Sequence, residues 1–432
     1  MITVAPFDPE LSRALHGPDW LRARRAEALE RATAAGMPTT EDEVWRYSRI
    51  DELDVARFTP VLPAADLPPD DGSLSDLHQQ VVAAIGETAG VVVIRNGRLA
   101  ACHLSPDAVA RGLTVGALGD HPTDTELPLM ARPATGDTVV DLNTAYSEPV
   151  VVRVPRGVVI EPPLLVLQWI DAELAAVFPR LVLAGGEASQ LTVIEHVASA
   201  DVEALSVPVV ELDVADGAVV RYLTAQQLGH RVWQLGHQAG RVGRNASLSS
   251  ANVALGGDYA RSRVDVEMAG EGGNADLVAV YFSDGRQTHD FRTLQDHHGR
   301  RTTSDLSFKG AVAGEAHAVY TGLIRVNPGA AGTSAFLTNR NVVLSEHARV
   351  DSVPNLDIIN ENDLRNCGHA SASGPIDTDQ LFYLESRGVP TETAKRLVVL
   401  GFFDDVLART PVPSLRALLR QAVATKLDRV TP

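Results

Sequence analysis

Residues 351–388 read DSVPNLDIINENDLRNCGHASASGPIDTDQLFYLESRG, and this stretch joins two kinds of predicted structure. Its first half is typical of a β-strand, because the apolar residues of LDII lie between Pro354 and a polar run. Its second half predicts a helix, with Asp377 as the capping residue and Gln380 reaching back to it.

Cys367 and His369 lie between these halves, two positions apart. In an extended segment side chains alternate in direction, so the thiol and the imidazole emerge on one face. Two ligands cannot enclose a metal, so the pair is either a buried thiol beside a hydrogen-bonded imidazole or half of a metal site. Thiolate suits iron–sulfur clusters and imidazole suits iron, so a site completed by a second chain is chemically reasonable.

The preceding part of the chain, from about residue 137, consists of short β-rich runs such as VVVRVPRGVVI, QLTVIEHV and ADLVAVYFSD. Gly, Asn, Asp and Pro separate these runs, and no convincing amphipathic helix interrupts them. Because strands do not alternate with helices, a parallel α/β sheet is excluded, and a sandwich, barrel, propeller or β-solenoid remains. The length of the block and the lack of a propeller repeat favour the solenoid, that is, a mainly β fold with a β-helix core.

Helices are predicted before this block, within residues 1–36 and at about residues 74–86, because apolar residues recur at helical spacing. Asn96 and Gly97 separate two apolar runs. Both residues tolerate positive φ, so they predict a tight β-hairpin.

Helices are also predicted after Gly374. Thr391 is expected to cap the second of them, with an inner face of Ala394, Leu397, Val398, Phe402 and Val406. Ser414 is expected to cap the last, with an apolar stripe of Leu415, Leu418, Leu419, Val423 and Leu427. The predicted units are a helical or mixed region (1–130), a β-helix core (131–374) and a helical domain (375–432).

Composition narrows the class of protein. The 432 residues are too many for one ordinary core. The formal charge of −17 argues against a nucleic-acid binder, because phosphate contacts need clustered Lys and Arg. Two cysteines make no disulfide framework, and the sequence shows neither a secretory signal nor an apolar run long enough to span a membrane. We expect a soluble cytoplasmic protein.

Common catalytic signatures are absent: there is no P-loop, no G-x-S-x-G, no H-E-x-x-H and no paired C-x-x-C. Two other clusters place a carboxylate beside imidazoles, Asp296 with His297 and His298, and Glu315 with His317. Such groups either orient a ligand or are ordinary hydrogen-bonding surface residues. Cys102 is interpreted as a small buried hydrophobe.

A resemblance to a known family follows from the stretch VPNLDIINENDLRNCGHASASGPIDTDQLFYLESRGVPTETAKRLVVLGFF (353–403). It is similar to the C-terminal signature of the SufB/SufD family of iron–sulfur cluster assembly proteins, in which a P-x-L-x-I strand leads to a Cys-Ser-His-Gly-like element. EVWRYS (43–48) and LNTAYSEPVVVRVPRGVVIEPPL (142–164) also resemble segments of the family.

The resemblance implies a right-handed parallel β-helix between helical regions. It also implies a non-catalytic scaffold subunit that pairs with SufB through the β-helices and docks the ATPase SufC on its C-terminal helices. ATP hydrolysis would belong to SufC, which agrees with the missing P-loop.

The SufD branch of the family fits better than the SufB branch. SufB is richer in cysteine and carries Glu after the His of this element, where Ala370 stands here; Gly368 replaces the usual Ser. The SufD His is proposed to face a SufB cysteine, and that role maps onto His369, with Cys367 as a secondary ligand. Docking of SufC is expected on helices within 377–430, including Tyr383, Arg387, Phe402 and Phe403.

The resemblance implies no tightly bound cofactor in the isolated chain and a transient iron–sulfur cluster in the complex. The sequence leaves open whether flavin binds that complex and whether the isolated chain forms a homodimer.

Three other readings remain. One is a SufB-like subunit that builds the cluster on its own cysteines. Another is a β-helical carbohydrate-active enzyme, in which Asp265, Glu267 and Asp276 would supply paired carboxylates. The third is a structural β-solenoid without a metal role.

Overall fold

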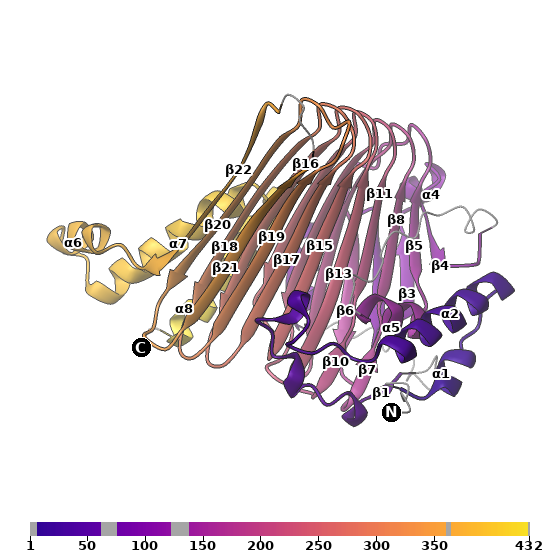
Figure 1. Ribbon diagram of the computed structural model, residues 1–432, viewed down its shortest axis with the longest axis horizontal. Coiled ribbons are helices and arrows are strands. Elements are labelled where there is room, and N and C mark those ends of the chain that lie inside the picture. The colour runs from indigo at the N-terminus through magenta and orange to yellow at the C-terminus, as the bar shows by residue number, and fades with distance from the viewer. Residues whose placement is uncertain (1–6, 62–75, 122–137, 360–363, 431–432) are drawn as a thin grey trace.

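Two long β-sheets form the core in the computed structural model, which describes residues 7–61, 76–121, 138–359 and 364–430 (Figure 1). Sheet A contains β5 (Val150–Val154), β8 (Arg180–Gly185), β11 (Val209–Val214), β13 (Val232–Val242), β15 (Tyr259–Met268), β17 (Thr288–His297), β19 (His317–Val326) and β21 (Arg349–Ile358), in that order. Sheet B contains β6 (Leu164–Ile170), β9 (Gln190–Ser199), β12 (Val219–Gln227), β14 (Ser247–Ala254), β16 (Asn274–Ser283), β18 (Thr303–Val312), β20 (Ser334–Val343) and β22 (Asn366–Pro375).

The chain passes from one sheet to the other and back, so each coil adds one strand to each sheet. This gives a parallel β-solenoid of about eight turns, in which strands pair in register with the previous coil. The predicted mainly β fold, with a β-helix core and helices at both ends, is confirmed.

The coil length is not constant. Successive partners Ser247, Asn274, Thr303, Ser334 and Asn366 are 27, 29, 31 and 32 residues apart (274 − 247, 303 − 274, 334 − 303, 366 − 334). The strands keep their register because the turns, which lie outside the sheets, absorb the extra residues. A fixed sequence repeat is therefore missing although the structure repeats.

The interior between the sheets is apolar, with aromatic rings in its C-terminal half. Tyr281, Phe291, Phe308 and Tyr320 are fully buried there, and neighbouring ring centroids lie 5.0–5.7 Å apart.

At the N-terminal end of the stack, an antiparallel hairpin of β2 (Gly90–Arg95) and β3 (Arg98–Leu104) pairs with β6, and β4 (Thr114–Ala117) pairs with β5. The hairpin predicted at Asn96-Gly97 is confirmed, with φ of 48° and 80°. Helix α4 (Pro106–Ala110) connects β3 to β4. Three short parallel strands extend sheet A: β1 (Thr59–Pro60), β7 (Ala175–Val177) and β10 (Ala204–Ser206). The predicted division at residues 130 and 374 stays a prediction.

The N-terminal segment packs on the outer face of sheet A. It comprises α1 (Pro9–Arg13), α2 (Asp19–Ala35) and the 3-10 turns η1 (Glu43–Trp45), η2 (Ile50–Glu52) and η3 (Val55–Arg57). The Arg261 guanidinium stacks 3.6 Å from the centroid of the buried Trp45 ring and pairs with Asp290 at 2.6 Å, which fixes this segment to the sheet.

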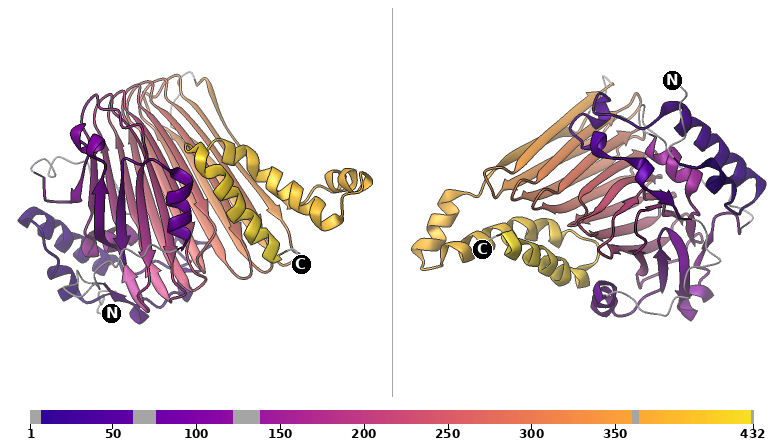
Figure 2. Two further views of the ribbon diagram at one scale, coloured as in Figure 1. Left: turned by 180° about the vertical axis from the view of Figure 1, so that it is seen from behind. Right: turned by 90° about the horizontal axis from the view of Figure 1, so that it is seen from below.

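The outer face of sheet B carries α3 (Asp76–Ile85), α7 (Thr391–Ala408), η5 (Pro413–Leu415) and α8 (Arg416–Val430) (Figure 2). Arg409 at the end of α7 binds Asp276 and Asp305 of sheet B. Helix α6 (Thr378–Ser386) extends away from the body of the molecule (Figure 1). None of the helices in the described part of the chain is both long and apolar enough to cross a membrane.

Three local predictions are wrong. Helix α5 (Val139–Tyr146) interrupts the region predicted to be β only, and it lies fully buried against α2. Thr391 and Ser414 are not caps: Pro390 occupies the cap position of α7, and Ser414 lies inside η5.

The buried face of α7 is formed by Ala394, Val399, Leu400, Phe403, Val406 and Leu407, whereas the predicted Leu397 is exposed. Residues 397–403 are apolar almost all round the helix, so packing on sheet B rather than periodicity selects the inner face. Burial of Leu415 in η5 and of Leu419, Val423 and Leu427 in α8 confirms these four positions of the predicted stripe, and Leu418 is half-buried.

Candidate functional site

The open end of the β-helix, meaning the edge formed by β21 and β22, contains both predicted ligands. Each of these strands pairs on one side only, β21 with β19 and β22 with β20. Such an edge leaves backbone N–H and C=O groups without ladder partners and is a template for another strand.

His369 stands at the end of an interior row of leucines. The in-register ladder aligns Leu277, Leu306, Leu337 and His369 on successive strands of sheet B. The three leucines are fully buried in the core, but His369 is exposed because the described chain provides no further coil to cover it. An imidazole therefore takes the row position at which the three preceding coils of sheet B have a buried leucine.

Cys367 lies one row away, next to Ala335 of β20. The thiol is half-buried and packs against the edge of the interior core. Burial raises the pKa of Cys367, so the thiol is protonated at neutral pH until a metal or a positive charge approaches it. As expected from extended backbone, Cys367 and His369 share one face of β22.

A polar network holds β22 to β21 beside these residues. Ser352 of β21 contacts Ser371 of β22 at 2.7 Å between their hydroxyl oxygens and donates to the Asn339 carbonyl at 2.9 Å. The Asn339 amide donates in turn to the hydroxyl of the buried Tyr281 at 2.9 Å. Hydrogen bonds that begin at the buried Tyr281 thus fix the position of β22, the strand that carries His369.

The open end also exposes apolar side chains. Leu356, Ile358 and Ile359 are 38 %, 44 % and 53 % exposed, although the sequence pattern predicts them as part of an ordinary strand. The sequence does not show which coil is the last of the β-helix. It therefore could not predict that these three apolar side chains are exposed.

The other histidine clusters are hydrogen-bonded parts of the fold. His317 donates to Asp351 rather than to Glu315, with 2.7 Å between Nε2 and Oδ2. Burial alone would raise the pKa of Asp351, but hydrogen bonds from Arg349 and His317 outweigh it and lower that pKa.

In the second cluster, His297 is buried between the hydroxyls of Thr302 and Ser304, at 2.7 and 2.9 Å. His298 pairs with Asp296 on the surface. Cys102 is half-buried beside the core rather than fully buried.

The residues predicted to dock an ATPase separate into two groups. On α6, Tyr383 is 58 % exposed and its ring lies 5.3 Å from the Arg387 guanidinium. On α7, Phe403 is fully buried, and half-buried Phe402 receives the Lys309 ammonium over its ring. Phe382 of α6, which sequence reasoning missed, is 72 % exposed.

Of the three carboxylates considered for a carbohydrate enzyme, Asp265 and Glu267 lie on β15 of sheet A, and Asp276 lies on the other sheet. Asp265 binds His237 and Arg263, whereas Asp276 binds Arg409. Within the residues that the structure describes, no three His, Cys, Asp or Glu side chains are grouped to hold a metal ion. A metal at Cys367 and His369 would need further ligands from outside this part of the chain.

Comparison with known proteins agrees with the resemblance seen at this end of the chain. Residues 168–402 match the family model described as SUF system FeS cluster assembly, SufBD core domain. An iron–sulfur cluster assembly SufBD family protein of Mycobacterium tuberculosis is 42 % identical over 188 residues, which cover 42 % of this chain and 47 % of that protein. The match thus spans about half the length of that relative.

Two relatives align over most of the chain. The iron–sulfur cluster assembly protein SufD of Bacillus subtilis is 26 % identical over 426 residues, 95 % of this chain and 94 % of that protein. The chloroplastic protein ABCI7 of Arabidopsis thaliana is 25 % identical over 421 residues, covering 93 % and 85 %. Because the family model matches more than half of the 432 residues, the chain belongs to the SufB/SufD family of the SUF iron–sulfur cluster assembly system and is SufD-like.

Proposed function

We propose that the chain is a non-catalytic scaffold subunit of a SUF assembly complex, pairs through its open end with a SufB-type subunit, and contributes His369 to a cluster site shared between the two. The observation that carries the proposal is His369 at the uncovered end of the Leu277–Leu306–Leu337 row. A partner coil laid on β22 would bury the imidazole and bring its own ligands beside it.

The edge favours such a partner physically. A strand added to β21 and β22 pairs their free backbone groups and covers Leu356 and Ile358, which are partly exposed. Burial of apolar area is worth about 25 cal/mol per Å², and backbone pairing fixes the register. A second copy of the chain offers the same edge, so a homodimer of the isolated subunit is included in the proposal.

The ligand set divides between the chains. Neutral imidazole and thiolate are common ligands of iron and of iron–sulfur clusters, and two such groups are half of a four-ligand site. His369 is the main ligand because it is exposed. Cys367 is the secondary ligand, because burial raises the pKa of its thiol and the thiol must lose its proton before it can bind a metal. The cluster is cargo, released to other proteins.

The C-terminal helices form the contact with the second partner, a SufC-type ATPase. Phe382, Tyr383 and Arg387 of α6 form an exposed aromatic and cationic surface that suits the docking of a SufC-type ATPase. Phe403 supports α7 from the core instead of touching a partner directly.

The test is co-expression with SufB-type and SufC-type subunits, followed by iron and sulfide analysis of the purified complex. His369→Ala is expected to leave the complex intact and to lower its cluster content at least several-fold. Phe382→Ser with Tyr383→Ser is expected to lose the ATPase and keep the SufB-type subunit.

The matched control is His298→Ala, which removes an exposed histidine that pairs with Asp296 two strands in from the edge, and it should leave the cluster content unchanged. Normal iron and sulfide in the His369→Ala complex would contradict the ligand assignment alone. Failure of the unmodified chain to bind either subunit would contradict the scaffold function.

A further inference from the structure

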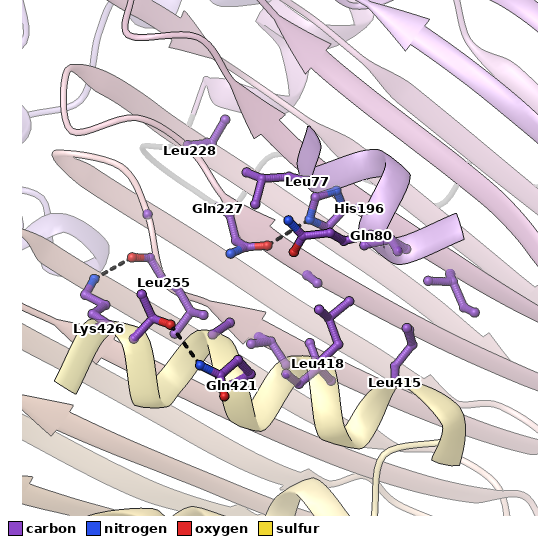
Figure 3. A pocket seen from close by; sticks show the side chains of 18 of the residues that line it. Leu77, Gln80, His196, Gln227, Leu228, Leu255, Leu415, Leu418, Gln421 and Lys426 are labelled. Carbon is purple, nitrogen blue, oxygen red and sulfur yellow. Dashed lines mark hydrogen bonds between the residues drawn. The ribbon is translucent and has the colours of Figure 1, made fainter. Parts of the chain in front are cut away.

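A groove lies between helices α3 and α8 on the outer face of sheet B (Figure 3). Its volume is about 350 Å³, and its floor is formed by side chains of β9, β12 and β14, including Ile194, Ala225 and Val253. The groove exists because α3 and α8 stand side by side on the sheet without closing over these strands. Its size is within the range of small-molecule pockets.

One half of the groove is apolar. Leu415, Leu418 and Leu419 line it from η5 and α8, and Leu77 and Val81 line it from α3. In Figure 3 Leu418 projects from α8 toward the α3 side, so the two helices form opposing apolar walls. Such walls fit a hydrocarbon chain rather than a polar metabolite.

The other half is cationic and rich in hydrogen-bond donors. Lys426 and Arg429 line it, and no Asp or Glu does, although the chain as a whole carries a formal charge of −17. Lys426 is held by Asp284 at 3.0 Å, so its charge is balanced inside the protein. Arg429 is exposed and makes no ion pair within the described residues, so its charge is available to a ligand.

The side-chain amide of Gln227 offers further hydrogen-bond donors, because a neutral histidine, His196, fixes its orientation. Burial lowers the pKa of His196, so its ring is uncharged, and Nε2–H donates to the Gln227 carbonyl oxygen at 2.9 Å. Because that oxygen is occupied, the amide group of Gln227 is left with its two N–H donors for the groove. Gln80 of α3 adds a second side-chain amide to the same lining.

We propose that this groove binds a small amphipathic carboxylate, with its hydrocarbon chain between α3 and α8 and its carboxylate at Arg429 and Gln227. Decanoate, a ten-carbon carboxylate, represents this class of ligand, because the groove volume of about 350 Å³ lies within the range of small-molecule pockets. The bound chain would join α3 to α8 and so fasten the C-terminal helices to the β-helix. The proposal is independent of the cluster site.

The test is calorimetric titration of the full chain with sodium decanoate and, separately, with 1-decanol. We expect decanoate to bind with a Kd on the order of 100 μM or below and to raise the melting temperature, since a ligand that binds only the folded state stabilises it. Decanol, which lacks the charge, should bind at least about tenfold more weakly.

Arg429→Gln should raise the Kd of decanoate about tenfold, and Ala422→Trp, which fills the groove, should abolish binding. Arg420→Gln is the matched control, because Arg420 lies on the same helix but pairs with Asp404 outside the groove. No heat of binding at about 1 mM decanoate, equal affinity for decanol, or an unchanged Kd in Arg429→Gln would each overturn the proposal. The comparison of decanoate with decanol uses the unmodified chain, so it tests the proposal even if a substitution disturbs folding.

Discussion

Individual glycines in the β-helix make room for the aromatic rings of its interior. Gly310 of β18 lies under the ring of Tyr281, and a Cβ atom built there would overlap that ring far inside van der Waals contact. It would also meet the Asn341 side chain, which accepts a hydrogen bond from the Tyr281 hydroxyl. Both neighbours are buried and hydrogen-bonded, so neither can move away cheaply.

Gly310→Ala is therefore expected to lower the free energy of unfolding by about 3 kcal/mol, the upper part of the range for an overpacked core. The change should be measured as a shift of the urea unfolding midpoint. Gly401→Ala is the control, because nothing lies within 4 Å of a Cβ at that position in α7. There the helix should gain up to about 1 kcal/mol. Similar midpoints for the two variants would show that Tyr281 does not need the glycine.

At the scale of elements, one lysine attaches α8 to sheet B. Lys426 is 5 % exposed, and its ammonium donates to the Leu255 carbonyl and to Gln287 and pairs with Asp284. Burial lowers the pKa of Lys426 to about 8, although Asp284 opposes this shift. The folded protein therefore releases this proton at a lower pH than the unfolded chain, whose lysines titrate near 10.4.

The pH dependence of this attachment follows from that difference. Between about pH 8 and 10 the unfolded state binds more protons at Lys426 than the folded state, so stability from this group rises with pH. Lys426→Met should remove that rise, which amounts to at most about 1.4 kcal/mol per pH unit. Urea unfolding of both proteins at pH 7.5, 8.5 and 9.5 measures it.

The same substitution leaves Asp284 without its cation, so at pH 7.5 it should cost about 3 kcal/mol. Lys395→Met is the control, because Lys395 pairs with Glu392 on the exposed side of α7 and should change stability by less than about 0.5 kcal/mol. A constant difference between the original and Lys426→Met proteins at all three pH values would contradict the lowered pKa.

Elements were predictable from sequence where a local rule determines them. The Asn96-Gly97 hairpin follows from two residues that accept positive φ, and the cap of α6 at Asp377 is confirmed by its bonds to the Asp379 and Gln380 amides. Helix α5 was missed because it is buried on all sides, its polar residues Asp141, Asn143 and Thr144 included, so no solvent-facing polar stripe marks it in the sequence. The inner face of α7 was wrong for a related reason, since that helix is apolar almost all round.

The candidate site was predictable only in part. The shared face of Cys367 and His369 follows from strand alternation. The position of His369 at the end of the leucine row does not follow from sequence, because coils of 27 to 32 residues leave no fixed period from which to align the rows. The α3–α8 groove gave no sequence signal, since its lining residues come from segments more than 300 residues apart.

On the scale of the whole molecule, the β-helix has two unlike ends. At the N-terminal end the β2–β3 hairpin and α4 cover the interior, and Ala108 and Leu113 pack into the core there, whereas Leu356, Ile358 and His369 are exposed at the other end. In a solenoid each coil is stabilised by the coils next to it, so the last coil should open most easily. Amide hydrogen exchange is therefore expected to be slowest in β13–β18 and fastest among the strands in β21 and β22.

A SufB-type subunit that adds a coil at the open end should reverse this order locally. Exchange in β21 and β22 should slow at least tenfold in the complex, while exchange in β2 and β3 stays unchanged because those strands lie at the other end of the stack. Mass spectrometry of deuterated peptides from the free and bound chain resolves both regions. Protection of β2 and β3 instead of β21 and β22 would place the partner on the covered end, and His369 would then have no chain opposite it with which to share a cluster.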